Sequence, residues 1–479
     1  MKNFKTKGLI ILAATLITVG LVACNKGTES QGTEAPTDAP VNSTEETVEV
    51  TDPVVDVPTE EPTDAPTEAP TEAPTEAPTE APTEAPTEAP LKDQLGLDVK
   101  AEDLQDIMQN IFEGTQSLKE TVMFIDKGDV KELLYPIESI VTVTSYDGKK
   151  VYEEGKDYVI EDGKLKVTEN SSIPCITSAR YYNYAGSLIQ INGKNIFWGE
   201  SQIKQWQVSV TYNHAGNWEG YLQESQLDIY QNFVKKLING EDVTVYFYGD
   251  SITYGACASF LEGADPKQGT YAMLFVQSLA DIFDYTVKYI NTGLSAAMAC
   301  AKVPTEDYVA GTRGTITYVN TAIGGWTSND GVNNFEKFVK EPAATYGCDL
   351  LVLAYGMNDG GFAARSTSNN MKKMADAMYE MNPDVSVVFV SSMSPHNGST
   401  WDFDSIKQQE TQLQKQAETY QKDGKACAVA CVNSVSLSIL KHKTFNDYSG
   451  NNINHPNDWF YRVYAQTLLQ TLIGYENMK

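Results

Sequence analysis

The C-terminal half of the chain alternates short apolar runs with longer segments of helical periodicity. The predicted strands are 243–248, 286–290, 315–319, 349–354 and 385–390, and the predicted helices lie near 271–283, 405–420 and 458–475. Runs that are apolar throughout fit strands buried on both faces, as in a parallel sheet covered by helices. The pattern therefore predicts a doubly wound α/β domain over residues 240–479.

The preceding segment, residues 91–239, has a different pattern. A helix is predicted near 103–120 because Leu104, Ile107, Ile111 and Phe112 recur at helical spacing. Beyond it, short strand-like runs separated by Asp-Gly turns predict a small antiparallel β-sandwich. These runs are 140–145, 157–160, 164–167, 187–191 and 206–212.

Aromatic residues gather in the second half of this β-domain. Trp198, Trp206 and Trp218 could form platforms that stack on sugar rings, although packing in the core is the commoner role of such residues. His214, in the same region, is expected to be a structural, hydrogen-bonded histidine.

A low-complexity segment precedes the β-domain. Residues 25–90 hold 12 of the chain's 20 prolines, and six Pro-Thr-Glu-Ala units run from Pro66 to Ala89. The segment has little apolar surface to bury and cannot offset the entropy of ordering, so a disordered linker is predicted. In polyproline geometry, at about 3.1 Å per residue, it could span roughly 200 Å.

The first 24 residues are typical of a lipoprotein signal peptide. Lys2, Lys5 and Lys7 precede an apolar run that leads into Leu21-Val-Ala-Cys24. This tetrapeptide resembles a bacterial lipobox, which implies cleavage before Cys24 and lipidation of its thiol. An ordinary signal peptide or anchor is the alternative. We predict a lipid-anchored protein on the extracellular face of a bacterial membrane, with a linker that reaches into the cell wall.

The net charge of −28 is unevenly distributed. Residues 25–90 contain 17 Asp or Glu and one Lys, a net of −16, and residues 1–24 contribute +3, which leaves −15 for the remainder. No basic stripe is present, so nucleic acid is not expected as a partner. An acidic surface also disfavours anionic polymers and anionic lipid faces, and neutral substrates fit better.

Candidate chemistry lies at the ends of the predicted strands. Gly249-Asp-Ser251 follows the first strand, where open α/β sheets bind their ligands. Three further segments come later, in the order Asn320-Thr-Ala-Ile-Gly-Gly-Trp-Thr-Ser328, Leu353-Ala-Tyr-Gly-Met-Asn-Asp359 and Asn452-Ile-Asn-His-Pro-Asn457. Each segment alone has a structural explanation, but the four in this order point to one catalytic site.

The four segments resemble the blocks of the SGNH (GDSL-type) hydrolases, over about the C-terminal half of the chain. The resemblance implies a flavodoxin-like three-layer α/β/α fold and ester hydrolysis through an acyl-enzyme, without metal or cofactor. It implies Ser251 as the nucleophile and His455 as its base. The backbone N–H groups of Ser251 and Gly325 and the side chain of Asn358 would form the oxyanion hole.

Neighbouring residues of these blocks have other expected roles. Asp250 and Asp359 are expected to brace the turns that carry the working groups. His396 and His442 also follow the third block, but they lack the His-Pro context just before a final helix.

The chain departs from the family pattern at the last block. The family usually has Asp three residues before the histidine, where this chain has Asn452. We predict that a carbonyl, of Asn452 or of the backbone nearby, accepts the Nδ1–H of His455 and fixes its tautomer. The alternative is a displaced acid, Asp447 or Asp458.

The leading functional prediction is a cell-surface serine esterase that removes O-acetyl groups from extracellular polysaccharide. The surface anchor and the β-domain favour a bulky substrate, and no apolar lid of the kind expected in a lipase is evident. A lipid or thioester hydrolase of the same family is one alternative. Another is a carbohydrate-binding surface protein with a weak or inactive hydrolase domain, which Asn452 and the aromatic β-domain would explain.

The remaining cysteines suggest no metal site. They are Cys175, Cys257, Cys300, Cys348, Cys427 and Cys431. They show no framework of regular spacing, and the last two lack the neighbouring His or Cys of a zinc site. We expect mostly buried thiols.

Overall fold

The computed structural model describes residue 108 and residues 110–360, 363–401 and 403–474. The predicted signal peptide, lipidation site and linker, and the first part of the helix predicted near 103–120, lie outside these residues. All described residues belong to one of the two compact units of the chain, Glu84–Lys479. In the part of the chain that the structure describes, no helix combines the length and apolar character needed to cross a membrane.

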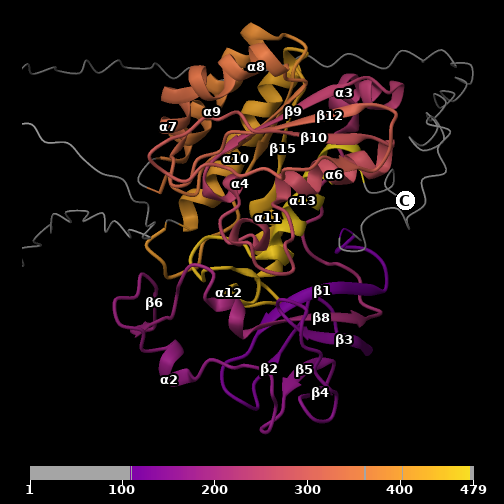
Figure 1. Cartoon of the computed structure of the whole chain (residues 1–479). Coiled ribbons are helices and arrows are strands. Elements are labelled where there is room, and N and C mark those ends of the chain that lie inside the picture. Colours follow the sequence, from indigo (N-terminus) through magenta and orange to yellow (C-terminus); the bar gives the residue numbers. More distant parts are fainter. Residues whose placement is uncertain (1–107, 109, 361–362, 402, 475–479) are drawn as a thin grey trace, which may run out of the picture. The chain divides into compact units, whose positions relative to one another are not determined.

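A seven-stranded sheet forms the centre of the C-terminal half (Figure 1). Its order is β11-β10-β12-β9-β13-β14-β15, and only β11 runs antiparallel to its neighbour. The strands are β9 (Val243–Gly249), β10 (Thr286–Ile290), β11 (Tyr308–Val309), β12 (Thr315–Asn320), β13 (Leu350–Ala354), β14 (Ser386–Val390) and β15 (Cys427–Ala430). The five predicted strands are confirmed, and β15 is a sixth parallel strand that was not predicted.

Five of these strands have the flavodoxin-like order. Numbered along the chain, β12-β9-β13-β14-β15 gives 2-1-3-4-5, and β10 and β11 extend the sheet beyond β12. The order reverses at β9, whose two neighbours are β12 and β13. The crevice beyond the carboxyl ends of the strands at this reversal is where folds of this type bind their ligands.

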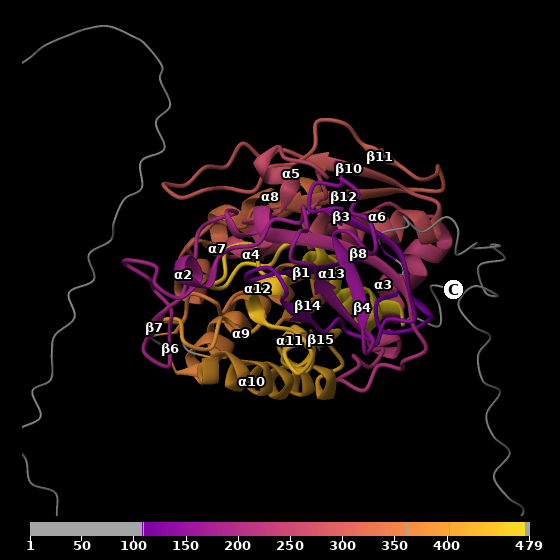
Figure 2. The same ribbon diagram turned by 90° about the horizontal axis from the view of Figure 1, so that it is seen from below.

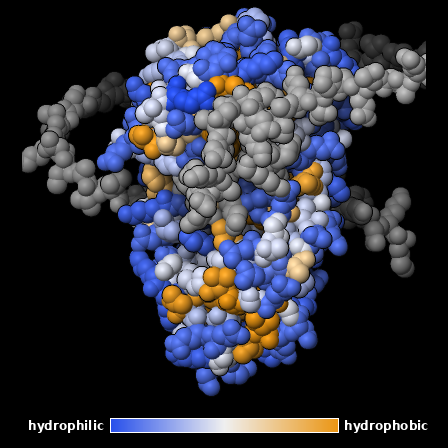
Figure 3. Space-filling view, turned by 90° about the vertical axis from the view of Figure 1, so that its right-hand side faces the viewer, coloured by the Kyte–Doolittle hydropathy of each residue, from blue (hydrophilic) through white to orange (hydrophobic). Residues whose placement is uncertain are grey.

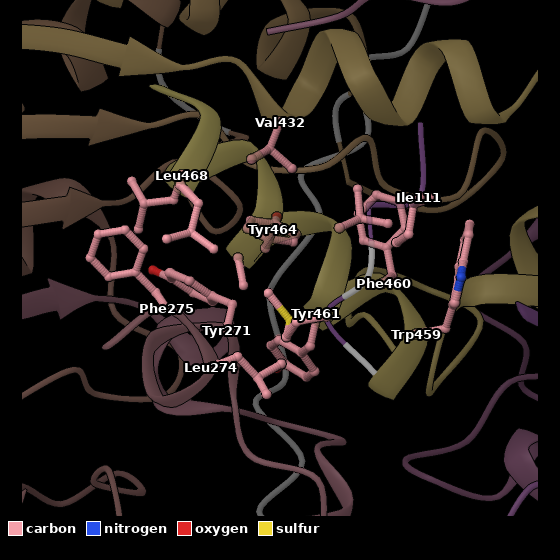
Figure 4. Packing of buried hydrophobic residues seen from close by; sticks show 14 of the residues in the cluster. Ile111, Tyr271, Leu274, Phe275, Val432, Trp459, Phe460, Tyr461, Tyr464 and Leu468 are labelled. Carbon is pink, nitrogen blue, oxygen red and sulfur yellow. The ribbon is translucent and has the colours of Figure 1, made fainter. Parts of the chain in front are cut away.

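Helices cover both faces of the sheet, so the predicted three-layer α/β/α fold is confirmed. One hydrophobic core contains buried residues of α3, α6, α11 and α13, and a second contains those of α7, η3, α8, α9 and α10. Figure 4 shows α6 packed on α13, where the rings of Tyr271 and Tyr464 stack with centroids 5.2 Å apart. The helices are α3 (Leu227–Asn239), α4 (Ser251–Tyr254), α5 (Ser259–Glu262), α6 (Tyr271–Phe283), α7 (Ser328–Phe335), η3 (Glu336–Lys340), α8 (Glu341–Tyr346), α9 (Ala364–Met381), α10 (Phe403–Lys422), α11 (Val432–Ile439), α12 (Phe445–Tyr448) and α13 (Asp458–Ile473).

The residues before the central sheet form an antiparallel β-domain, called the accessory domain below. Two three-stranded sheets, β1-β8-β3 and β2-β5-β4, contribute buried residues to the first hydrophobic core, and β6 and β7 form a separate pair. The elements are β1 (Gln116–Met123), β2 (Val130–Lys131), β3 (Ser139–Ser145), β4 (Tyr158–Glu161), β5 (Lys164–Val167), α2 (Ser178–Tyr181), β6 (Gln190–Ile191), β7 (Lys194–Asn195), η2 (Ile203–Trp206) and β8 (Gln207–Asn213).

The helix predicted near 103–120 is wrong at its C-terminal end, because Gln116 begins strand β1. This strand pairs with β8 along most of its length and buries Val122 and Met123 completely. Pairing with a distant strand satisfies the backbone and buries these side chains. It therefore overrides the helical spacing of the local sequence.

Buried polar contacts join the accessory domain to the α/β domain of residues 240–479, on the side where α12 lies (Figure 2). Glu120 of β1 and Lys443 form an ion pair of 2.6 Å, and both side chains are 0% exposed. Glu120 also accepts hydrogen bonds from the Tyr212 hydroxyl and the Leu134 N–H. Removing one partner of a buried pair leaves an uncompensated charge and costs about 3–5 kcal/mol. The contact therefore ties the two domains together.

A third hydrophobic cluster joins the accessory domain to the loop that follows α12. All but one of its buried members come from the accessory domain, and the exception is Ile453, which is 2% exposed. The buried members are Met123, Ile176, Tyr181, Ile189, Ile196, Phe197, Ile203, Trp206 and Ile453. The accessory domain thus forms part of the support for the loop that carries His455.

Candidate active site

The turn after β9 holds Ser251 at the first position of α4. Asp250 caps this helix, because its Oδ1 accepts the N–H of Ile252 at 3.0 Å. Only glycine fits at position 249, since a Cβ there would lie 2.4 Å from the Ala354 carbonyl oxygen and 2.4 Å from Thr253 Oγ1. The Gly-Asp-Ser sequence therefore gives a tight turn that places the serine at the end of the central strand.

The structure brings the two predicted catalytic residues together. Ser251 Oγ lies 2.9 Å from His455 Nε2, although 204 positions separate the residues in the sequence. His455 lies in the loop between α12 and α13, and its carbonyl oxygen accepts hydrogen bonds from the Gly450 N–H and the Ser449 hydroxyl. The Ser251 side chain has one ring nitrogen as its partner, as a base-activated nucleophile requires.

Two of the three predicted oxyanion-hole residues, Gly325 and Asn358, follow the strands on either side of β9. Gly325 follows β12 and is exposed with φ +78°, a backbone conformation that favours glycine. The N–H of Gly324 donates to Ala299, whereas the N–H of Gly325 has no hydrogen-bond partner among the described residues. Asn358 follows β13, and its Nδ2 donates to the carbonyl of Trp326 at 3.0 Å, which links the two loops.

The two aspartates of the motif have the bracing positions that were predicted for them. Asp359 accepts hydrogen bonds from the N–H of Ser328 at the start of α7, and burial raises the pKa of its carboxyl. Burial raises the pKa of Asp250 to about 7, and its Oδ2 has no hydrogen-bond partner within the described part of the chain. Asp250 therefore acts as a helix cap that is half-neutral near pH 7.

Neither the three residues proposed to orient His455 nor a backbone carbonyl of the described residues is hydrogen-bonded to its Nδ1, so this prediction is wrong. Asn452 points into the accessory domain, where its Nδ2 donates to the carbonyl of Phe197 at 2.7 Å and to the Tyr181 hydroxyl at 3.2 Å. Its φ of +66° explains why the loop has Asn here, since Asn tolerates the left-handed conformation better than most residues.

The two aspartates considered as displaced acids are engaged elsewhere. Asp447 closes the capping box of α12 with Thr444 and accepts the N–H of Met123. Asp458, in the first turn of α13, accepts the N–H of Ser259 at 2.9 Å. Both carboxylates therefore support backbone structure instead of the imidazole.

A residue of the accessory domain lies beside the imidazole instead. Glu200 Oε2 is 3.2 Å from His455 Nδ1, and Glu200 Oε1 accepts a hydrogen bond from Asn451 Nδ2 at 3.0 Å. Burial alone would raise the pKa of Glu200, but the charge of His455 and hydrogen bonds from His455, Asn451 and Cys257 outweigh it and lower the pKa to about 2. Glu200 was not among the predicted site residues.

Cys257 completes the surroundings of Glu200. Its thiol donates to Glu200 Oε2 at 3.1 Å and lies 4.0 Å from His455 Nδ1, and burial raises its pKa. The ligand atoms of these three residues lie within 4.8 Å of one another and could hold a metal ion. An ion there would replace the hydrogen bond between His455 and Glu200. The six described cysteines form no disulfide, and four of them are buried, in line with the expected thiols.

His214 and Trp206 of the accessory domain have structural positions. His214 stacks on Tyr135 with ring centroids 3.9 Å apart, and its Nδ1 lies 3.2 Å from the Gly216 carbonyl oxygen. Trp206 is buried edge-on against Phe197. These contacts favour the core interpretation for His214 and Trp206, while Trp198 and Trp218 are only partly buried.

A family model described as GDSL-like lipase/acylhydrolase matches residues 245–468. This match covers all four sequence blocks, from the strand before Ser251 to the helix after His455. Residues 245–468 of the chain therefore match a GDSL-like lipase/acylhydrolase domain, and the Ser251–His455 pair lies within the matched region. A second model, described as PT disordered repeat, matches residues 56–92. No curated protein matches the chain significantly.

Several solved structures are similar to the chain at low identity. One is a two-domain esterase active on acetylated mannans, co-crystallised with mannopentaose, at 15% identity and TM-score 0.38, with 54% of this chain and 56% of that chain covered. Another is a catalytic mutant of an acetylxylan esterase from Geobacillus stearothermophilus, at 15% identity and TM-score 0.35, with 50% and 96% covered. The chain spans little more than half the length of the two-domain esterase structures that it matches.

The buried position of Asn452 predicts the effect of giving it a charge. Asn452→Asp removes the donor to the Phe197 carbonyl and places a carboxylate against that oxygen, so we expect a loss of about 1–3 kcal/mol in the free energy of unfolding. No gain in kcat/KM is expected. Asn452→Gly should lower the free energy of unfolding by less, because glycine tolerates the same backbone conformation and adds no charge. Urea unfolding and esterase kinetics measure both effects, and a higher kcat/KM at unchanged stability would contradict this placement.

The raised pKa of Asp250 predicts how stability depends on pH. The carboxyl has a pKa of about 7 in the folded protein and about 4 when unfolded, so the folded state binds more protons between these values. The contribution of Asp250 to the free energy of unfolding is fully present below about pH 4 and is lost as the pH rises toward 7. Asp250→Asn keeps the cap acceptor and removes the titration.

The melting temperature of Asp250→Asn should therefore rise relative to that of the wild type as the pH increases from about 4 to 8. Thermal unfolding of both proteins at several pH values measures this difference. A difference that stays constant over the range would show that Asp250 does not titrate there.

Proposed function

We propose that this protein is a cell-surface serine esterase that removes O-acetyl groups from extracellular polysaccharide. The observation that carries the proposal is the 2.9 Å contact between Ser251 Oγ and His455 Nε2 at the carboxyl end of β9, inside a GDSL-like acylhydrolase domain. The sheet order reverses at this strand, so the pair lies where the fold places a substrate.

The proposed reaction proceeds through an acetyl-enzyme. Ser251 Oγ attacks the acetyl carbonyl carbon while His455 Nε2 takes the hydroxyl proton. The negative charge on the carbonyl oxygen is held by the N–H groups of Ser251 and Gly325 and by Asn358 Nδ2. When the tetrahedral intermediate collapses, His455 returns the proton to the departing sugar alcohol. Water activated by the same imidazole then releases acetate and regenerates the serine.

The surface of the protein supports a polar substrate. Figure 3 shows one face, on which hydrophilic residues predominate and hydrophobic residues form separate groups, mainly in its lower half. Together with the net charge of −15 that remains outside residues 1–90, this favours a neutral, hydrated polymer over a lipid interface.

The alternative of an inactive binding protein is less well supported by this site. The main reason to consider this alternative was that position 452 holds Asn and not an acid. Glu200 and Asn451 lie beside His455 Nδ1, so the imidazole has partners that can fix its orientation. The contact of its Nε2 with Ser251 favours catalysis over binding alone.

The proposed location rests on the sequence of the N-terminus. Leu21-Val-Ala-Cys24 after an apolar run supports lipidation at Cys24, and 66 residues rich in Pro, Thr and Glu would separate the anchor from the domains. An enzyme tethered in this way would act on polymers in or beyond the cell wall. The prolines and like charges support an extended tether.

The proposed activity predicts the behaviour of Ser251→Ala. Acetate release from acetylated polysaccharides, such as mannan and xylan, should fall by about 10⁴-fold or more, because alanine cannot form the acetyl-enzyme. Asn358→Ala should lower kcat by about 10²–10³-fold, because one oxyanion donor is lost. A fluorophosphonate should label wild-type Ser251, and circular dichroism should show intact folding of both variants. Full turnover by Ser251→Ala would eliminate the proposed nucleophile.

The proposed anchor predicts that Cys24 carries a fatty acid. A radiolabelled fatty acid fed to cells should label the wild-type protein and should not label Cys24→Ser, because the thiol is the site of modification. Cys175→Ser, which changes a cysteine far from the N-terminus, is the matched control and should retain the label. Label on Cys24→Ser would refute the lipobox assignment.

A further inference from the structure

We propose that Glu200, contributed by the accessory domain, is the positioning residue that completes a Ser251–His455–Glu200 triad. The proposal rests on the esterase function above. Glu200 would take the role of the aspartate that is missing at position 452, although 255 positions separate it from His455 in the sequence. The accessory domain then forms part of the active site.

The hydrogen bonds of Asn451 show why the carboxylate is needed. Asn451 Oδ1 accepts the backbone N–H groups of Ile453, Asn454 and His455 at 2.9–3.1 Å, which fixes the orientation of the amide. Its Nδ2 therefore faces Glu200 Oε1, Asn454 Oδ1 and His455 Nδ1, at 3.0, 3.1 and 3.0 Å. Two hydrogens on this nitrogen have three possible acceptors.

With Glu200 present, Glu200 Oε1 and Asn454 Oδ1 can accept the two hydrogens of Asn451 Nδ2. His455 Nδ1 is then free to donate its own proton to Glu200 Oε2, which leaves the lone pair of Nε2 facing Ser251. Without Glu200, one Asn451 hydrogen loses its acceptor and can bond to Nδ1. That bond favours the tautomer with its proton on Nε2, which cannot act as a base toward Ser251.

Charge strengthens the same arrangement. The pKa of Glu200 lies far below the pH at which esterases work, so the residue is a carboxylate when His455 accepts the proton from Ser251. A negative charge 3.2 Å from Nδ1 stabilises the imidazolium that forms in the transition state. The Cys257 thiol donates to the same oxygen, Oε2, and helps to hold it in place.

The backbone near Glu200 is fixed on both sides. The N–H of Gly199 donates to the carbonyl of Asn451 at 3.2 Å. Farther along the segment, the Ser201 hydroxyl and Lys204 Nζ bond to Glu262 of α5, the latter at 2.9 Å. These contacts hold the carboxylate at the imidazole even though 59% of the Glu200 side chain is exposed. This exposure also gives small solutes access to the position.

Three substitutions of Glu200 in the full-length protein test the proposal. Glu200→Ala and Glu200→Gln should lower kcat by about 10²–10⁴-fold with little change in KM, because the imidazole loses its charge partner and its correct tautomer. Glu200→Asp keeps the carboxylate and should recover at least about tenfold over the glutamine variant. Glu132→Gln, which breaks an exposed ion pair of the accessory domain with Lys164, is the matched control and should stay within about twofold of wild type.

A further readout separates positioning from a merely structural role. Formate added to Glu200→Ala should restore part of kcat, because a small carboxylate can enter the exposed space beside Nδ1.

The outcomes distinguish this inference from the proposed function. A wild-type protein that releases no acetate and resists fluorophosphonate would overturn the esterase function. An active wild type with Glu200→Ala and Glu200→Gln within about fivefold of it would overturn the role of Glu200 alone. Activity that is lost in both variants, without formate rescue and without recovery in Glu200→Asp, would show a structural role and would also overturn the proposal.

Discussion

The loop that carries His455 depends on its burial against the accessory domain. Ile453 packs in a hydrophobic cluster whose other buried members all belong to that domain, and Asn452 donates to the carbonyl of Phe197. Next to these anchors, the Asn451 side chain accepts three successive backbone N–H groups. The same docking brings Glu200 to Nδ1, so one interface supports the shape of the loop and the electrostatics of its imidazole. The buried Glu120–Lys443 pair holds this interface from a second position.

The central sheet provides the other half of the site. Ser251, Gly325 and Asn358 follow three adjacent strands, β9, β12 and β13, whose carboxyl ends meet at one edge. Backbone hydrogen bonds from Ile323 to Gly249 and from Asp250 to Ala354 connect these strand ends. The proposed nucleophile and oxyanion donors therefore lie at the edge of the central sheet. The proposed base, in contrast, lies in a loop that packs against the accessory domain, so this domain supports part of the site.

Much of this could be predicted from the sequence because it is encoded locally. The apolar run 243–248 predicts a buried strand, and Gly249-Asp-Ser251 predicts a tight turn at its end, whereas the role of Ser251 as nucleophile followed only from the four blocks taken in order. His455 was predictable because the His-Pro context lies just before a helix. The helix predicted near 103–120 failed where pairing with β8 outweighed local spacing.

Glu200 could not be found in the same way. Trp198-Gly-Glu200 has no motif, and its proximity to His455 arises from tertiary docking across 255 positions. The only signal was indirect, namely the missing acid at position 452, and spacing directed attention to Asp447 and Asp458 because they are close in sequence. Pairwise contacts between distant segments are set by packing of whole domains, which local pattern does not specify.

The central claim is that a carboxylate from the accessory domain sets the tautomer of His455. The chain has only four histidines, so nitrogen-15 NMR of protein labelled at histidine can resolve each ring directly. We expect neutral His455 to carry its proton on Nδ1 in the wild type and to shift toward protonation on Nε2 in Glu200→Gln. An unchanged tautomer in the two proteins, or a proton on Nε2 in the wild type, would contradict the account.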